Sequence, residues 1–249
     1  HIQLTSNIIG IKGDISVTPR GKAIAYYPSV LETIKKHNFV KKTSPIVSGQ
    51  ALALGAKTNS GVLIKGIDLV DLKNKGEILT NVFQGSFEGY EGTTALAVGA
   101  ELAHNLGVSV GSKIKLISPN VISTTFGTMP RSKDFTVIAI FSSGLYDYDS
   151  ATMVMPVSAA QKFLSLGEEI NLIEINVDNP ELAKAYASLL QKELGPGVRV
   201  SSWLDSNQQF LKALEIERTA MFTILSLIII VAAFNIISSL FMIVKDKTK

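Results

Sequence analysis

The sequence of 249 residues contains no cysteine, so disulfide bonds, thiolate metal sites and cysteine nucleophiles are excluded. It also lacks the G-x-x-x-x-G-K-[S/T] and G-x-G-x-x-G patterns of phosphate-binding loops. Its three histidines are far apart and lie beside no acidic pattern, so nothing supports a zinc site. Aromatic residues at 7% and a net charge of +3 spread along the chain give no nucleic-acid footprint. The sequence thus argues against cysteine-dependent chemistry, phosphate-binding loops, zinc sites and nucleic-acid binding.

Charged residues are scarce as well, at 18% against roughly 25% in an average soluble domain. The mean hydropathy of +0.29 is correspondingly high. The excess is concentrated in residues 221–244, MFTILSLIIIVAAFNIISSLFMIV, where 24 residues include 19 apolar ones and no charge. Because ~20 apolar residues in a helix cross the hydrocarbon core of a bilayer, we predict a water-soluble body joined to one membrane helix.

The charges on either side of this span predict its orientation. Lys245, Lys247 and Lys249 follow it at once, whereas residues 215–219 on the other side are acidic on balance. The positive-inside rule then places the C-terminal end in the cytoplasm. Residues 1–220 are expected outside, which means the periplasm in a Gram-negative cell.

Within the span, Ala232, Asn235 and Ser239 follow the spacing i, i+3, i+7 and share one helix face. Small and polar residues on one face let a neighbouring helix approach closely and form hydrogen bonds. A tolerated scatter of small residues is the alternative. The amphipathic stretch before the span lacks glycine and proline, so we predict one continuous helix over residues 207–245. A break between the two parts is the alternative.

Two regions of the body share a strand–helix–strand pattern, and proline marks the start of each helix. The predicted elements are a strand over 14–17, a helix over 28–37, a strand over 39–47, a strand over 170–177, a helix over 180–194 and a strand over 198–203. Two such units form a small ferredoxin-like sheet with helices on one face. We assign residues 1–49 and 167–206 to this subdomain.

Residues 50–166 separate the two units and are predicted to form an inserted, mostly β subdomain. Its expected strands cover residues 62–67, 96–98, 113–117, 135–141 and 151–155. One helix is expected over residues 99–106, and a short second helix is expected to begin near residue 157. Gly107 is a plausible C-cap of the first of these helices.

Residues 107–111 match the G-x-S-x-G pattern of the α/β-hydrolase nucleophile. That motif needs a strand before the serine and a helix after it, and here the predicted order is inverted. We therefore interpret Ser109 as part of a turn. A membrane-anchored hydrolase is the alternative, and it would lose activity in Ser109→Ala.

Residues 118–134, SPNVISTTFGTMPRSKD, do not fit the pattern of a short connection between strands. Their apolar residues are expected to be exposed: Val121, Ile122, Phe126 and Met129. Loops with apolar tips often bind a partner, because contact with solvent gives no reason to keep such residues there. A loop folded back on its own domain is the alternative.

The C-terminal strings LSLI and VAAFNIISSL within residues 225–240 resemble the second membrane helix of LolC/LolE permeases, which belong to lipoprotein-releasing ABC transporters in the wider MacB/FtsX-like group. The resemblance extends through the body, over residues 44–49, 61–68, 98–103, 106–108 and 203–205. It implies an α+β fold: a MacB-like periplasmic domain with a porter-like split β-α-β subdomain and an inserted sabre-like subdomain, followed by one transmembrane helix. We expect a fragment that lacks the family's first, third and fourth membrane helices.

The resemblance also implies a function. Such a permease subunit extracts lipoproteins from the bacterial inner membrane and passes them to a LolA-type periplasmic carrier for sorting to the outer membrane. A separate LolD-type ATPase binds and hydrolyses ATP, so this chain is expected to have no catalytic residue, metal or cofactor. The second permease in the complex is either another copy or a different LolC/LolE-type chain. A MacB/FtsX-like mechanotransmission subunit in efflux or cell-wall regulation is the alternative.

LolC-type members of this family carry a long β-hairpin, the hook, which recruits the carrier. Residues 118–134 are similar to it, with Ser132 in place of a polar amide. The implied carrier-binding residues are Lys115, Pro119, Phe126, Gly127, Met129 and Pro130.

Overall fold

The computed structural model describes residues 13–74, 81–124, 127–206 and 208–246, without the side chains of residues 74, 120–129, 206–215 and 240–246. The chain separates into two compact units, His1–Trp203 and Leu204–Lys249. We call the first unit the body. Each unit is described by itself.

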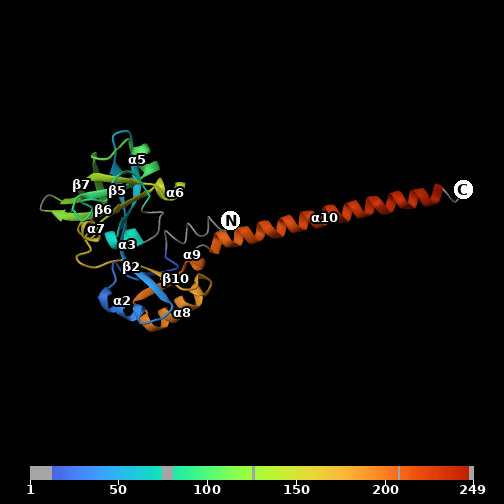
Figure 1. Cartoon of the computed structure of the whole chain (residues 1–249), viewed down its shortest axis with the longest axis horizontal. Helices are drawn as coiled ribbons and strands as arrows, with labels where there is room; N and C mark the ends of the chain where they lie inside the picture. The colour runs from blue at the N-terminus through green and yellow to red at the C-terminus, as the bar shows by residue number, and fades with distance from the viewer. Residues whose placement is uncertain (1–12, 75–80, 125–126, 207, 247–249) are drawn as a thin grey trace. The chain divides into compact units, whose positions relative to one another are not determined.

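One part of the body is a four-stranded antiparallel sheet in the order β10-β1-β9-β2. Its elements are β1 (Ile15–Pro19), α2 (Tyr27–Lys35), β2 (Val40–Leu54), β9 (Leu172–Val177), α8 (Ala183–Leu194) and β10 (Val198–Ser202). Because β9 lies between β1 and β2, and β1 lies between β9 and β10, both β-α-β units are split as predicted. We call this part the first sheet (Figure 1).

The helix ends of the first sheet follow from local chemistry. The Asn179 side chain accepts a hydrogen bond from the Glu181 backbone N–H at 3.0 Å, which satisfies one of the unpaired donors at a helix start. A 3₁₀ turn, η1 (Pro180–Leu182), then leads into α8. Pro28 occupies the first turn of α2. The two helices lie side by side, because His37 directly after α2 is 2.7 Å from Glu193 of α8.

The other part of the body is a closed β-barrel. Its strands are β2, β3 (Asn59–Gly66), β8 (Thr152–Met155), β5 (Ala95–Gly99), β7 (Gly127–Phe141) and β6 (Lys113–Thr124). Each of these strands pairs with the next, and β6 pairs back to β2, which closes the ring. The short strand β4 (Val82–Gly85) is attached outside the ring to β7. The prediction of a mostly β insert is confirmed.

The chain between β3 and β9 also contains the helices α3 (Leu69–Asn74), α5 (Ala100–Leu106), α6 (Tyr146–Asp149) and α7 (Val157–Leu164). The predicted helix before Gly107 is α5, and Gly107 ends it with a φ of 68°. The left-handed conformation there favours glycine. The helix expected near Val157 is α7. The elements α3, β4 and α6 were not predicted.

Several boundaries differ from the prediction, among them the extents of β6 (113–124 instead of 113–117) and β7 (127–141 instead of 135–141). Two others concern strands of the first sheet. Strand β2 does not end at residue 47 but continues to Leu54, because its second half pairs with β3 and β6. Trp203 does not belong to β10 but begins α9 (Trp203–Ser206). Since β2 belongs to both the first sheet and the barrel, the two share a strand, and their division at residues 49 and 166 stays a prediction.

Gly99, at the start of α5, leaves no room for a side chain. A Cβ atom there would overlap the backbone carbonyl of Asp149. We expect Gly99→Ala to lower the free energy of unfolding by about 1–3 kcal/mol, as overpacking does. Gly61→Ala is the matched control, because a Cβ at Gly61 meets nothing within 4 Å. Thermal unfolding of both variants tests this, and an undiminished melting temperature for Gly99→Ala would contradict the packing.

Asp14 predicts a pH dependence of stability. Burial raises the pKa of this carboxyl, although it accepts a 2.9 Å hydrogen bond from the Val177 backbone N–H. A raised pKa means that the folded protein binds the proton more readily, so this contribution to stability is present at low pH and is lost as the pH rises through the raised pKa. We expect Asp14→Asn to be more stable than the parent at pH 7 and to lose that advantage on acidification. Urea unfolding of the parent and of Asp14→Asn, at pH 7 and at acidic pH, measures the difference in their free energy of unfolding.

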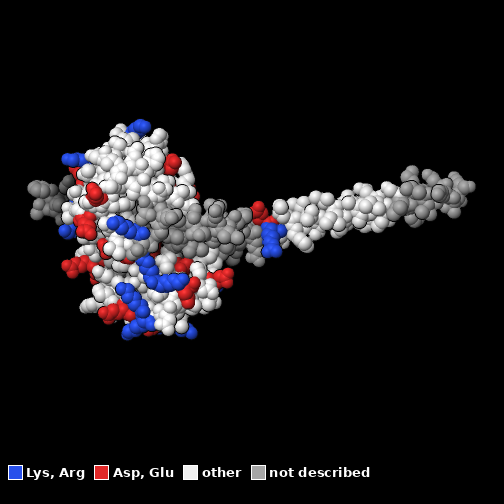
Figure 2. All heavy atoms as spheres, in the orientation of Figure 1, with Lys and Arg blue, Asp and Glu red and all other residues white. Residues whose placement is uncertain are grey.

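The second unit contains one long helix, α10 (Gln208–Asp246), of 39 residues, which passes Thr219 without a break. Its stretch Ile216–Ser239 is long and apolar enough to cross a membrane, with a mean hydropathy of 2.6 and no part of the window buried. Residues 219–239 contain no Lys, Arg, Asp or Glu, and the corresponding stretch of the helix is white in Figure 2. At 1.5 Å per residue, 24 residues extend about 36 Å, which is enough for the hydrocarbon core.

Candidate functional site

The segment 118–134 is a paired β-hairpin formed by β6 and β7. At its base the register runs from Lys113 opposite Thr136 to Ile117 opposite Ser132. Towards the tip it runs from Val121 opposite Pro130 to Thr124 opposite Gly127. The segment therefore extends the barrel strands β6 and β7 beyond the ring rather than forming an irregular loop.

Between these two stretches the register shifts, because Ser118, Pro119 and Asn120 of β6 face only Arg131 of β7. Proline has no backbone N–H to donate to a ladder, so a bulge is one of the few places where a strand tolerates it. Pro119 and Pro130 lie at this irregularity and are both exposed. A bulge bends the strand locally, so the two prolines mark where the hairpin arm departs from the barrel.

The base of the hairpin is fixed on two sides. Ile114, Leu116 and Phe135 are fully buried in the barrel, and the Phe135 ring meets Phe163 of α7 edge-on, with 5.7 Å between the ring centroids. Rigid support of this kind limits how far the arm can move relative to the barrel.

On the other side of the base, Arg131 ties the arm to the end of α7. Its Nη1 donates to the carbonyl of Lys162 at 2.5 Å and to Oγ of Ser165 at 2.7 Å. A cation is favourable at a helix C-terminus. Lys133 donates to the carbonyl of Thr93 at 2.9 Å. Burial lowers the pKa of Lys133, and the nearby charges of Lys162 and Arg131 lower it further.

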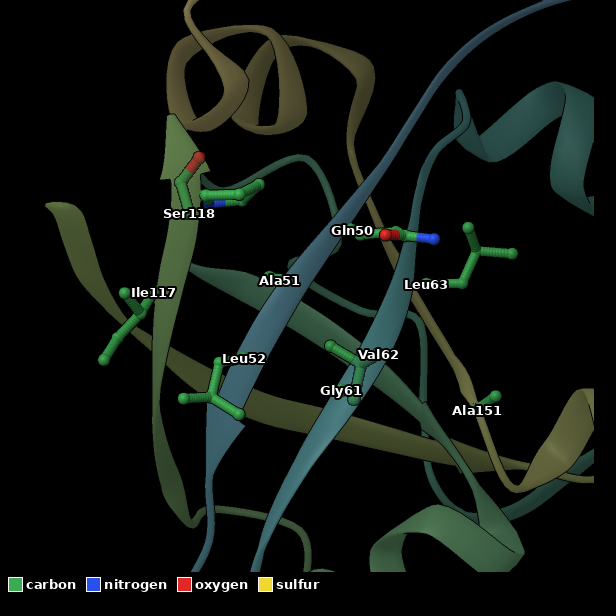
Figure 3. A pocket seen from close by; sticks show the side chains of 10 residues that line it. Gln50, Ala51, Leu52, Gly61, Val62, Leu63, Ile117, Ser118 and Ala151 are labelled. Carbon is green, nitrogen blue, oxygen red and sulfur yellow. The ribbon is translucent and has the colours of Figure 1, made fainter. Parts of the chain in front are cut away.

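Lys115 is exposed on β6, opposite Asp134 of β7. Further along β6, a groove of about 570 Å³ lies on the outer face of β3, β2 and β6. The groove is lined by Gln50, Ala51, Leu52, Gly61, Val62, Leu63, Ile117, Ser118, Pro119 and Ala151. In Figure 3 the strands that carry Ile117, Leu52 and Gly61 lie side by side. A Cβ atom at Gly61 would meet nothing within 4 Å, so the groove has free space at this position. The surface beside the hairpin base is therefore hollow and largely apolar.

The predicted hook residues fall on this hairpin to the extent that they are described. Gly127 begins β7 opposite Thr124, and Met129 pairs with Ile122, while its side chain lies outside the described part. Phe126 lies outside the described residues. The structure thus places Lys115 at the hairpin base, Pro119 and Pro130 at the bulge, and the backbones of Gly127 and Met129 towards the tip. The side chains of Phe126 and Met129, on which the apolar tip depends, are outside the described part.

The second predicted set, Ala232, Asn235 and Ser239, lies in α10 within the apolar stretch, and all three side chains are exposed. Exposed side chains in the apolar stretch of α10 can contact lipid or another helix. No other helix is long and apolar enough to span a membrane among the residues that the structure describes.

Ser109 lies in the turn between α5 and β6, where its N–H donates to Oγ of Ser112 at 3.1 Å. The helix precedes the serine and the strand follows it, so the inverted order is confirmed and the hydrolase interpretation loses its structural basis. In the described ranges, no cluster of three His, Cys, Asp or Glu side chains could hold a metal ion.

Sequence reasoning missed one polar pair in the body. Nζ of Lys65 on β3 lies 3.3 Å from Oε1 of Glu174 on β9, with side-chain exposures of 5% and 3%. Each residue interrupts an apolar strand, VLIKGI and LIEINV, and this interruption was the signal that could have indicated a partner. His37 likewise has an acidic partner, Glu193, from a distant helix.

Comparison with protein families gives one match that covers most of the chain. Residues 2–193 match the MacB-like periplasmic core domain. A solved structure of the periplasmic region of MacB from Actinobacillus actinomycetemcomitans shares the fold, with a TM-score of 0.50 and 14% identity over 84% of this chain and 98% of that one.

Two curated proteins are similar over most of the chain. "Lipoprotein-releasing system transmembrane protein LolC" of Neisseria meningitidis serogroup B is 33% identical over 88% of this chain and 53% of its own length. The corresponding LolE of Haemophilus influenzae is 26% identical over 90% of this chain and 54% of its own length. The chain therefore spans about half the length of these relatives. A periplasmic-domain fold with a candidate spanning helix fits an inner-membrane permease.

Proposed function

Because the chain belongs to the MacB-like periplasmic core domain family, we propose that it acts in a permease subunit of an ABC transporter that extracts lipoproteins from the inner membrane. The lipoprotein passes to a LolA-type periplasmic carrier for sorting to the outer membrane. The observation that carries this proposal is the similarity to LolC and LolE relatives over 84–90% of the chain.

We place carrier binding on the β6–β7 hairpin. The proposed contacts are Lys115, Pro119, Phe126, Gly127, Met129 and Pro130. Four features of the described part support this: the strands project beyond the barrel ring, the base is anchored by Arg131, Pro119 and Pro130 are exposed, and an apolar groove lies beside the base. A projecting arm on a rigid base is suited to reaching a partner, because little conformational freedom is lost when it binds.

The remaining components are proposed to lie outside this chain. A LolD-type ATPase binds and hydrolyses ATP on the cytoplasmic side, so this subunit transmits movement and carries no catalytic residue or cofactor. A second LolC/LolE-type permease, the same or different, packs beside α10 through Ala232, Asn235 and Ser239. Residues 1–220 are periplasmic and the C-terminal end is cytoplasmic, as the lysines after the span require.

The likeness to MacB keeps a second function in view, a mechanotransmission subunit of efflux or of cell-wall regulation. At 14% identity this likeness shows the fold alone. The two functions differ in what accompanies the protein, which is a lipoprotein in one case and an outer-membrane channel or a cell-wall hydrolase activator in the other.

Native purification of the full-length protein with its ATPase, followed by mass spectrometry, separates the two. We expect triacylated lipoproteins in the purified complex. Recovery of an outer-membrane channel or a hydrolase activator, without lipoproteins, would contradict the proposal. A variant of the hairpin, Met129→Asp, should keep the lipoproteins and lose the carrier, which separates cargo binding from carrier binding.

A further inference from the structure

Among the residues that the structure describes, β2 is the one strand that runs through both the first sheet and the barrel, and it contains two weak points. Pro45 has no N–H to donate to the ladder, and glycine at position 49 weakens a strand by its flexibility. Pro45 lies near the end of the β9-paired part of β2, which ends at Ile46. Gly49 lies between that end and the part paired with β6, which begins at Leu52, in a stretch that β3 alone pairs. A bend of the body is therefore expected at this crossing.

Two polar contacts span the crossing. Asn171, directly before β9, accepts a hydrogen bond from the Ser48 N–H at 2.7 Å through Oδ1 and donates to the Ser48 carbonyl at 2.6 Å through Nδ2. The amide thus takes the place that a backbone partner has in a ladder. It holds β2 just where pairing with β9 has ended.

The second contact is an ion pair that involves Lys65, the β3 residue opposite Ser48. Lys65 of β3 pairs with Ser48 of β2, and its Nζ reaches across β2 to Glu174 of β9 at 3.3 Å. Glu174 itself pairs with Ser44 of β2. The ion pair therefore lies diagonally over residues 44–48, and any bend or twist of β2 there separates the two charges.

The ion pair is costly to bury. Both side chains are at most 5% exposed, and Nζ of Lys65 lies 5.5 Å from the centre of the Tyr148 ring. Burial acts to lower the pKa of Lys65, but Glu174 and the Tyr148 hydroxyl outweigh it and leave that pKa raised, so the lysine is charged. Apolar residues of similar volume often give equal or greater stability than a buried pair. Stability alone therefore does not account for it, whereas a geometric constraint does.

A third polar contact also restrains β2. Nζ of Lys42 on β2 donates to the carbonyl of Asp71 on α3 at 3.3 Å, with Oδ1 of the same aspartate at 3.8 Å. This pair is partly exposed and weaker. It joins the first-sheet half of β2 to the helix that follows the barrel strand β3.

We propose that Ser48, Lys65, Asn171 and Glu174 form a brace that holds β2 straight where it leaves the first sheet and enters the barrel, so that the two parts of the body move as one. This use of the brace rests on the proposed function, because a transmitting subunit must carry displacement from its membrane end to its hairpin without bending between them. The geometry of the brace does not depend on what is transported.

Spin labels at Glu101→Cys on α5 and Arg199→Cys on β10 report the distance between the two parts in the full-length protein. The 249 residues contain no cysteine, and any cysteine elsewhere in the full-length protein is first replaced with serine. We expect a single narrow distance in the parent protein. In the apolar double variant Lys65→Met/Glu174→Leu we expect a broadened distribution with a second population. The control Glu193→Gln removes an exposed pair within the first sheet and should leave the distribution narrow.

An unchanged narrow distribution in the double variant would overturn the proposal. If that variant does not fold by circular dichroism, Asn171→Leu tests the other arm of the brace by the same distance measurement, with the same two outcomes. Because the measurement involves no cargo and no ATPase, its failure leaves the proposed transport function standing. Failure of lipoprotein co-purification would likewise leave the measured rigidity standing.

Discussion

Replacing Phe126 with aspartate is expected to abolish capture of the LolA-type carrier by the full-length protein. An apolar side chain at the tip of a projecting arm is the kind of residue that becomes fully desolvated at the centre of an interface. Loss of such an anchor costs about 2 kcal/mol or more, or roughly 30-fold in affinity. A carboxylate adds the cost of its own desolvation. Met129→Asp should have the same effect. Binding of purified carrier to the immobilised permease measures both.

The matched control is Phe126→Leu, which keeps an apolar side chain at the same position and should retain most of the affinity. All three variants should unfold at the temperature of the parent, because the buried base residues Ile114, Leu116 and Phe135 are unchanged. Carrier binding that is equal in Phe126→Asp, Met129→Asp and the parent would show that the hairpin tip is not the docking site.

Removing one partner of the buried ion pair is expected to have the largest effect on stability. Lys65→Met leaves Glu174 buried at 3% exposure without its cation, and breaking a buried pair in this way costs about 3–5 kcal/mol. Marginal stability means that this loss is a large part of the total for a domain of this size. Urea unfolding of the full-length protein, followed by far-ultraviolet circular dichroism, measures the change.

The double variant Lys65→Met/Glu174→Leu supplies the control, because no unpaired charge remains in it. We expect it to recover most of the lost stability, so that the two single changes are strongly non-additive. A single variant within about 0.5 kcal/mol of the parent, as for an exposed site, would mean that the pair is not buried as described. The double variant also allows rigidity to be measured in a protein that still folds.

The first sheet could be predicted because its signals are local. Pro28 marks the start of α2, and Asn179 with Pro180 marks the start of η1 and α8, each between two apolar strands. Residues that carry such signals act on the next turn of the chain, so no tertiary contact is needed to interpret them. The same holds for Gly107, whose positive φ ends α5.

The elements that were missed depend on contacts between distant residues. Strand β2 continues past Gly49 because its second half pairs with β3 and β6. Glycine stands at position 49 because Leu164 of α7 occupies the space that a side chain there would need. The four-residue strand β4 pairs irregularly at the edge of β7 and has no alternating pattern of its own. Closure of the barrel depends on β6 returning to β2, and nothing near either strand in the sequence indicates that pairing.

The candidate site was predicted in part. The two prolines and the apolar composition of residues 118–134 indicated a projecting segment, and the register of β6 and β7 shows it to be a hairpin with a bulge at Pro119. Its anchoring by Arg131 to Lys162 and Ser165 could not be predicted, because 31 and 34 residues separate the partners and α7 must first be placed. Lys65 and Glu174, 109 residues apart, were missed for the same reason.

The most direct test of the central claim is transfer in a reconstituted system. The full-length permease and its ATPase are placed in proteoliposomes with a fluorescent triacylated lipoprotein, and purified carrier is added outside. We predict that labelled lipoprotein leaves the vesicles on the carrier only when ATP is supplied, and that Phe126→Asp prevents this while ATP hydrolysis continues. ATP hydrolysis with no lipoprotein on the carrier in the unmodified complex would contradict it.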